Sequence, residues 1–203
     1  MISYQKFINS NNYFPESKVL SLFSGISKSF IFGKCKYCHN FIEDYSFSYF
    51  IDQIIYLDFE LRNYYFSEIL DLNLGKNNIS VDCPICLKNI EISEITKLIK
   101  LPDVLIFTFE RYINGKNNIS IEPNLKINYE KYVDESLKKK YHYTYNYDLF
   151  AINIRIGESK DYGHEICQIK RNGEWYEIND NRIYKINKFN YKDSIYGLFY
   201  KRV

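Results

Sequence analysis

Four of the five cysteines in this chain form two Cys-x-x-Cys pairs, Cys35 with Cys38 and Cys83 with Cys86. A two-residue gap lets both thiolates of a tight turn face one ion, and four thiolates suit a tetrahedral zinc site. The 44 residues between the pairs, 39 to 82, are far more than a compact zinc ribbon contains. We therefore predict a structural zinc ion that joins two distant hairpins within a larger β-rich domain.

Other chemistry remains open for these cysteines. Two disulfides are an alternative, but the sequence has no signal peptide and no run of about 18 apolar residues to indicate export or a membrane span. Redox catalysis is another, although nothing near either pair resembles a thioredoxin βαβ unit. Cys35 to His39 also fits the c-type haem attachment pattern, whereas Leu87 follows the second pair. Zinc is the favoured interpretation, with a site that has lost its metal among the alternatives.

A second group of reactive side chains lies near the C-terminus. His164 opens one arm of an expected hairpin, Asn172-Gly173 supplies its turn, and Asn179-Asp180 closes the other arm after Trp175. An imidazole beside an amide or carboxylate is what a general base and its orienting partner require. On spacing alone, a surface histidine beside a polar turn is the commoner explanation.

Strands dominate the elements that would position these groups. The apolar run Val104–Phe109 is typical of a central strand covered on both faces, and no linker or repeat divides the chain. Further strands are expected at 29–34, 54–61, 79–82, 90–98, 147–156, 164–170, 175–178 and 196–200, and short helices at 16–22 and 67–74.

Composition adds little about function. The net charge of +2 does not favour a nucleic-acid partner, and the one dense basic run, Lys138 to Lys140, is expected in a solvated loop. The 21 tyrosines and 15 phenylalanines are expected in the core or beside neighbouring strands.

The order of short motifs resembles the ubiquitin-specific proteases, cysteine peptidases that remove ubiquitin. The matching segments run from Leu22 to the end of the chain. They are Leu22-Phe23-Ser24-Gly25 before the first cysteine pair, Tyr56-Leu57-Asp58, Leu101-Pro102-Asp103-Val104-Leu105 after the second pair, Glu110-Arg111-Tyr112, Tyr147 to Ala151, Gly163-His164, Trp175 to Asp180, and Tyr196-Gly197-Leu198-Phe199-Tyr200.

This resemblance implies an α+β, β-rich, papain-like fold with a palm and zinc-bearing fingers. Residues 1–203 would form one incomplete domain, with fingers at about 30–100, a palm at about 101–203 and most of the helical thumb missing. The four paired cysteines align with the zinc ligands of the fingers. His164 aligns with the general base, Asn179 with the third member of the catalytic triad, and Asp180 with a neighbouring substitute. Ubiquitin or ubiquitinated proteins would be the partners, in the cytoplasm or nucleus, without nucleic acid or membrane.

The family's nucleophile is the part of the pattern that this sequence lacks. It lies in an N-terminal cysteine box, and none of the 34 residues before Cys35 is a cysteine. Cys167 lies three residues after His164, so on a strand the two side chains point to opposite faces, and we expect Cys167 to be a small core residue. Glu165 replaces the family's aromatic residue after the histidine, and Tyr162 replaces a common glycine.

Two classes of function follow from this comparison. The chain is either the larger part of a thiol-dependent deubiquitinase, inactive as it stands, or a pseudo-deubiquitinase that binds ubiquitin or acts as a scaffold. A zinc-dependent nucleic-acid binder is a distant third, because no basic stripe is present.

Overall fold

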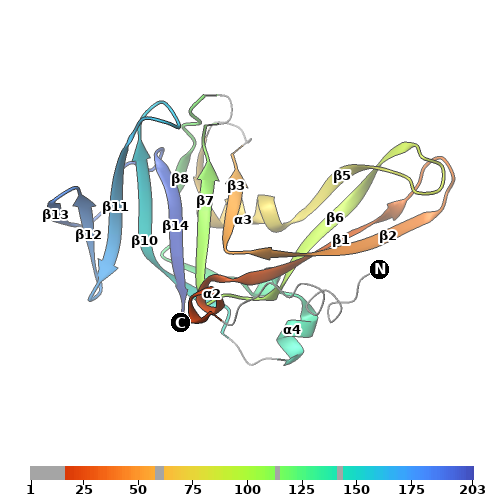
Figure 1. Ribbon diagram of the computed structural model, residues 1–203, viewed down its shortest axis with the longest axis horizontal. Coiled ribbons are helices and arrows are strands. Elements are labelled where there is room, and N and C mark those ends of the chain that lie inside the picture. Colours follow the sequence, from red (N-terminus) through yellow and green to blue (C-terminus); the bar gives the residue numbers. More distant parts are fainter. Residues whose placement is uncertain (1–16, 58–61, 113–114, 141–143) are drawn as a thin grey trace. The chain divides into compact units, whose positions relative to one another are not determined.

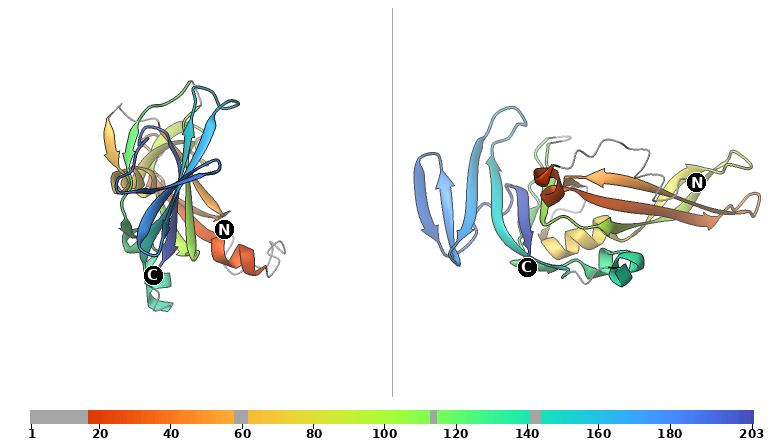
Figure 2. Two further views of the ribbon diagram at one scale, coloured as in Figure 1. Left: turned by 90° about the vertical axis from the view of Figure 1, so that its left-hand side faces the viewer. Right: turned by 60° about the horizontal axis from the view of Figure 1, so that its bottom comes forward.

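The computed structural model describes residues 17–57, 62–112, 115–140 and 144–203. The described residues fall into two compact units (Figures 1 and 2). The first unit takes residues from Met1–Phe50, Leu74–Leu101 and Lys131–Tyr143, and the second from Ile51–Asn73, Pro102–Glu130 and Thr144–Val203. Among the described residues, no helix has the length and apolar character needed to cross a bilayer.

A four-stranded antiparallel sheet forms the body of the first unit, with strand order β2-β1-β6-β5. Both of its hairpins turn at a cysteine pair, as the sequence predicts. The strands are β1 (Gly25–Lys34), β2 (Phe41–Phe50), β5 (Lys76–Asp82) and β6 (Asn89–Lys100). The strands predicted at 29–34, 79–82 and 90–98 are confirmed, and each is longer than expected. Strand β2 was not among the strands predicted from the sequence.

Short helices accompany this sheet. Helix α2 (Lys18–Phe23) leads into β1, and α4 (Glu135–Lys140) follows a segment that lies against β6, where the Asp134 N–H donates to the Leu98 carbonyl at 2.9 Å. The basic run predicted in a solvated loop is therefore the last part of helix α4. Glu16, at the start of the predicted first helix, lies outside the described residues.

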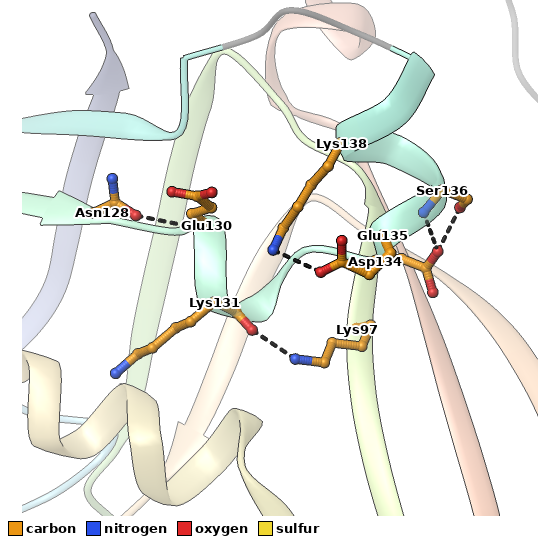
Figure 3. Close-up of polar contacts among 8 residues, drawn as sticks. All are labelled: Lys97, Asn128, Glu130, Lys131, Asp134, Glu135, Ser136 and Lys138. Atoms are coloured by element: carbon orange, nitrogen blue, oxygen red, sulfur yellow. Dashed lines mark hydrogen bonds and ion pairs between the residues drawn. The ribbon is translucent and has the colours of Figure 1, made fainter.

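Polar contacts begin helix α4 and tie its approach to β6 (Figure 3). The Asp134 carboxylate accepts the Ser136 N–H at 2.9 Å and also the Ser136 hydroxyl, an arrangement that satisfies donors at a helix start. The Lys97 ammonium donates to the Lys131 carbonyl at 2.6 Å. Burial raises the pKa of Asp134, but the Ser136 bonds and the charges of Lys28 and Lys97 outweigh it, so the net shift is downward.

The second unit is built on an eight-stranded sheet of order β13-β12-β11-β10-β14-β7-β3, with β9 paired to β10. All pairs are antiparallel except β3 with β7. The strands are β3 (Asp52–Tyr56), β7 (Val104–Glu110), β9 (Lys126–Asn128), β10 (Asn146–Ile156), β11 (His164–Arg171), β12 (Glu174–Asn179), β13 (Arg182–Ile186) and β14 (Ile195–Arg202). Residues 58–61, the last part of the strand predicted at 54–61, lie outside the described residues.

Smaller elements complete this unit. Helix α3 (Phe66–Leu74) confirms the short helix predicted at 67–74. A two-stranded parallel sheet joins β4 (Asn63–Tyr65) to β8 (Ser120–Glu122), and the 3-10 turn η1 (Glu130–Tyr132) follows β9. The Asn128 side chain accepts the Glu130 N–H at 2.9 Å where η1 begins.

Aromatic side chains from α3 and the sheet form the core of the second unit. Phe66 packs edge-on against Phe107, with ring centroids 4.7 Å apart, and stacks on Tyr200 at 5.5 Å. Along β7, Leu105, Phe107 and Phe109 are fully buried, whereas the residues between them are only half-buried. The prediction that β7 is covered on both faces is therefore wrong for the described residues, because apolar side chains here alternate between a packed face and a more open one.

One buried cation lies beside this core. Arg111 is 1% exposed, and its Nε donates to the Ile195 carbonyl at 2.6 Å. Its Nη1 donates to the carbonyls of Asn117 at 2.8 Å and Ile119 at 2.9 Å. Burial lowers the pKa of Arg111 to about 10, which leaves the guanidinium charged at neutral pH. Arg111, directly after β7, thus connects the end of that strand to the segment before β8 and to the first residue of β14.

Candidate functional site

The four paired cysteines meet in the first unit. Their sulfur atoms all lie within 4.8 Å of one another, and Sγ–Sγ distances are 3.7 Å both from Cys35 to Cys86 and from Cys38 to Cys83. A tetrahedral zinc with bonds of about 2.3 Å places its sulfur ligands about 3.8 Å apart. Two of the Sγ–Sγ distances therefore match the separation that one zinc ion requires, no pair is more than 4.8 Å apart, and all four cysteines are free thiols.

Each pair lies on a turn of the same construction. In the first, the Cys35 N–H donates to the Asn40 carbonyl and the His39 N–H donates to the Cys35 carbonyl, both at 2.9 Å. In the second, Cys83 makes the equivalent bonds with Lys88 and Leu87, also at 2.9 Å. The residue after each pair has a positive φ, 60° at His39 and 58° at Leu87. This backbone bend turns the chain back into the next strand, so that both sulfurs of a pair face inward.

Hydrogen bonds favour the thiolate form at the first cysteine pair, where they lower the pKa of both Cys35 and Cys38. The N–H groups of Tyr37 and Cys38 point at the Cys35 sulfur, at 3.4 and 3.5 Å. Hydrogen bonds from Asn40 lower the pKa of Cys38 to about 6. At Cys86 the Lys88 backbone bond lowers the pKa, but burial and the neighbouring thiols outweigh it and raise the pKa to about 11. Four thiolates this close would need a cation between them, and the all-sulfur donor set suits zinc.

In the second unit the structure brings His164 and Asn179 together. His164 Nε2 lies 2.8 Å from Asn179 Oδ1, which is the hydrogen bond predicted from the sequence. The two residues occupy the start of β11 and the end of β12, two paired antiparallel strands. Because the amide oxygen accepts, Nε2 carries the hydrogen, and the lone pair of a neutral ring is at Nδ1.

The turn between the two strands sets this register. Asn172 has φ 52° and Gly173 has φ 83°, the signs that a two-residue type I′ hairpin requires. The turn makes Cys167 oppose Ile178, and continuing this register by one residue places Asn179 opposite Ile166. Because Ile166 and His164 share a face of β11, His164 and Asn179 are diagonal neighbours on that face. The Asn-Gly signal in the sequence thus accounts for the meeting of His164 and Asn179.

Comparison with known proteins identifies the family of the chain. The family profile described as ubiquitin carboxyl-terminal hydrolase matches residues 5–200. The chain belongs to the ubiquitin carboxyl-terminal hydrolase family.

Curated and solved relatives extend the comparison. Ubiquitin carboxyl-terminal hydrolases 9 and 10 of Arabidopsis thaliana are 32% and 30% identical over 130 residues, which is 60% of this chain and 14% of each relative. A chain in a structure of the SAGA Ubp8/Sgf11/Sus1/Sgf73 DUB module bound to ubiquitin aldehyde aligns with a TM-score of 0.72, 23% identity, and coverage of 98% of this chain and 46% of that chain. A structure of the Ubp8-Sgf11-Sgf73-Sus1 SAGA DUB module gives the same score and identity. The likeness shows that the fold is the β-rich, papain-like one, and the chain spans less than half of the solved chains.

Within this hydrolase family member, Asp180 takes a different place from Asn179. It lies in the exposed two-residue turn between β12 and β13, with φ 52°. Among the described residues, no hydrogen bond joins the Asp180 side chain to His164. The geometry therefore favours Asn179 over Asp180 as the partner of the imidazole.

Cys167 lies on β11 between Asn153 of β10 and Ile178 of β12. The register is continuous from His164 to Cys167, so the two side chains point to opposite faces of the sheet. Burial raises the pKa of the Cys167 thiol, which keeps it protonated and unreactive at neutral pH. These facts agree with the prediction that Cys167 is not a nucleophile.

A buried polar pair within the β11–β12 hairpin was not found from the sequence. Gln168 is fully buried, and its Nε2 donates to Glu177 Oε2 at 2.8 Å. The two residues oppose each other across β11 and β12, and their bond fixes the spacing of the strands that carry His164 and Asn179. Two long polar residues at opposed positions of a hairpin were the signal available in the sequence.

Proposed function

We propose that this chain forms the palm and fingers of a cysteine-type deubiquitinase that hydrolyses isopeptide bonds at the ubiquitin C-terminus. The observation that carries the proposal is the 2.8 Å contact between His164 Nε2 and Asn179 Oδ1. Family membership supports it, because a histidine oriented by an amide is the base that a thiol protease needs.

In this proposal His164 acts through Nδ1. Its Nε2–H is held by Asn179, so Nδ1 takes the proton of the attacking thiol and later gives it to the leaving amine. Asn179 fixes the ring and its tautomer, and its oxygen stabilises the imidazolium that forms between these two steps. His164 is exposed, so the imidazole is accessible to a substrate.

Zinc has a structural role in this proposal. Cys35, Cys38, Cys83 and Cys86 hold the ion, which joins the β1–β2 hairpin to the β5–β6 hairpin. No water or substrate position remains on an ion with four protein sulfurs, so it closes the fold and takes no part in hydrolysis.

The 203 residues supply a base and its partner but no nucleophile. Four of the five cysteines belong to the proposed zinc site, and Cys167 faces away from His164. We therefore propose that this polypeptide by itself is inactive and binds ubiquitin. The same observation favours the second candidate, a pseudo-deubiquitinase that binds ubiquitin without cleaving it.

The proposed function predicts binding without turnover. The purified chain should bind ubiquitin in a calorimetric titration, release no fluorophore from a C-terminal ubiquitin amide, and remain unlabelled by a ubiquitin vinyl-type probe. Expression together with the coding sequence that precedes Met1 separates the two candidates, since turnover that His164→Ala abolishes would identify the enzyme. Labelling of Cys167 in the chain alone, or absence of ubiquitin binding, would contradict the proposal.

Replacement of Asn179 is expected to free the imidazole. In Asn179→Ala the Nε2–H tautomer loses its acceptor, and long-range proton–nitrogen NMR should show a mixture of both tautomers at His164. In a form that carries the nucleophile, kcat should fall by about 10²–10⁴ with little change in KM. Asp180→Ala is the matched control and should leave the His164 spectrum unchanged. Equal effects of the two substitutions would contradict the assignment of Asn179.

A further inference from the structure

The segment 157–163 joins β10 to β11 and ends directly at His164. Its two ends approach closely. A Cβ added at Gly157 would lie 2.6 Å from the Tyr162 carbonyl oxygen and 2.9 Å from the Gly163 Cα. One added at Gly163 would lie 3.0 Å from the Ile156 carbonyl oxygen. A larger residue at either glycine would push against the backbone of the opposite end of the segment. The close approach of the two ends therefore restricts the backbone directly before His164.

Arg155 binds this segment and the residue after His164 together. Its Nη1 lies 2.5 Å from Glu165 Oε1, and its Nη2 donates to the Lys160 carbonyl in the middle of the segment. The Arg155 side chain is only 20% exposed, and its guanidinium faces the Tyr112 ring at 6.0 Å. One planar group therefore joins β11 to the segment, which a single ammonium cannot do with the same geometry.

Residues at and beyond the end of β7 hold the same segment from a second side. The Tyr112 hydroxyl donates to the Gly157 carbonyl at 3.2 Å. Lys160 Nζ lies 3.8 Å from Glu110 Oε2, and Lys116 Nζ lies 3.3 Å from Glu158 Oε1. The segment is thus bound at its first residue and at its middle. Arg155 connects it to β11 at Glu165, the residue that follows His164.

We propose that Arg155 is a positioning residue for His164. Its bonds to Glu165 and to the Lys160 carbonyl hold the 157–163 segment against β11. This fixes the backbone at His164, so that the imidazole is directed toward Asn179 before substrate binds. Glu165 occupies the position where the resemblance to ubiquitin-specific proteases leads one to expect an aromatic residue. An aromatic side chain cannot pair with a guanidinium through charge, so the ion pair is the arrangement this chain uses in its place. The inference rests on the proposed role of His164.

Neutralisation and then reversal of the Arg155–Glu165 ion pair test this assignment. Arg155→Met and Glu165→Gln should each speed amide hydrogen exchange of residues 158–163 by about tenfold or more, because local opening then costs less. The same variants should reduce the Nε2–H tautomer of His164 in long-range proton–nitrogen NMR. The double variant Arg155→Glu with Glu165→Arg should recover part of both signals, and Arg155→Lys should recover less than the native arginine gives.

The Lys185–Glu174 pair provides the matched control. It is also 2.5 Å long and lies on β12 and β13, away from the segment. Reversal of its charges should change neither signal. The proposal is overturned if the Arg155 variants leave the His164 tautomer unchanged, even where exchange of the segment accelerates, or if the double reversal recovers nothing. Hydrogen exchange and the His164 tautomer are measured without ubiquitin and without turnover. The positioning role of Arg155 can therefore fail or hold independently of the proposed function.

Discussion

Removal of the metal from the four-cysteine site is expected to unfold the first unit. Structural zinc sites contribute apparent binding free energies of about 10 kcal/mol to folding, which is as large as the whole stability of a typical domain, about 5–15 kcal/mol. Cys83→Ser should therefore lower the zinc content from one ion per chain to well below one, and should abolish the cooperative thermal transition of this unit. Elemental analysis and a thermal melt followed by circular dichroism measure the two effects.

The reason for so large an effect lies in the packing around the sulfurs. Cys35 and Cys83 are fully buried and share a small apolar cluster with Ile42, Ile90 and Ile92. An ion held by the four sulfurs would therefore close a loop of more than 40 residues and would also fill the centre of the cluster at the ends of both hairpins. Without an ion, four sulfur atoms would face one another at 4.8 Å or less, two of them, those of Cys35 and Cys38, with a lowered pKa.

Cys167→Ser is the control for this prediction. Cys167 is in the second unit and far along the sequence from either pair, so its loss should leave the zinc content at one ion per chain. A chain that is folded and metal-free when purified, or one whose Cys83→Ser variant melts like the native protein, would contradict a structural zinc site.

Local signals made much of both sites predictable from the sequence. Two-residue spacing predicts that each cysteine pair shares a turn, and Asn172-Gly173 predicts the hairpin that brings His164 to Asn179. In both cases a short piece of backbone with few allowed conformations determines where the reactive atoms lie. These are the parts of the structure that follow from neighbouring residues alone.

The elements that the sequence did not predict depend on contacts between distant residues. In strand β2, Tyr45, Phe47 and Tyr49 alternate with serine and acidic residues, so the apolar pattern in the sequence is weak. The strand forms because it pairs along its whole length with β1. The basic run in α4 was predicted as a loop because the contacts that stabilise this helix lie outside the run. They are the cap at Asp134 and the bond from Asp134 to β6. Arg155 was missed because its partners are a backbone carbonyl and a residue on the next strand.

Arg111→Met is expected to destabilise the second unit by about 3–5 kcal/mol. Methionine fills much of the volume but leaves the carbonyls of Asn117, Ile119 and Ile195 without donors in a buried place. Each unsatisfied buried acceptor costs about 1–3 kcal/mol, and relief of the buried charge offsets only part of that loss. Chemical denaturation followed by tyrosine and tryptophan fluorescence should show a lower midpoint for this unit.

Two further variants make this prediction specific to the hydrogen bonds of the guanidinium. Arg111→Lys keeps the charge but cannot reach three carbonyls with a planar fork, so it should recover only part of the loss. Arg171→Met changes an exposed arginine at the β11–β12 turn and should alter stability by no more than about 0.5 kcal/mol. If Arg111→Met were as stable as the native chain, the three carbonyl bonds would contribute nothing beyond the cost of burying the cation. Arg111 would then serve to fix the path of the chain after β7, because a buried cation with three carbonyl partners excludes other arrangements of those segments even where it adds no net stability.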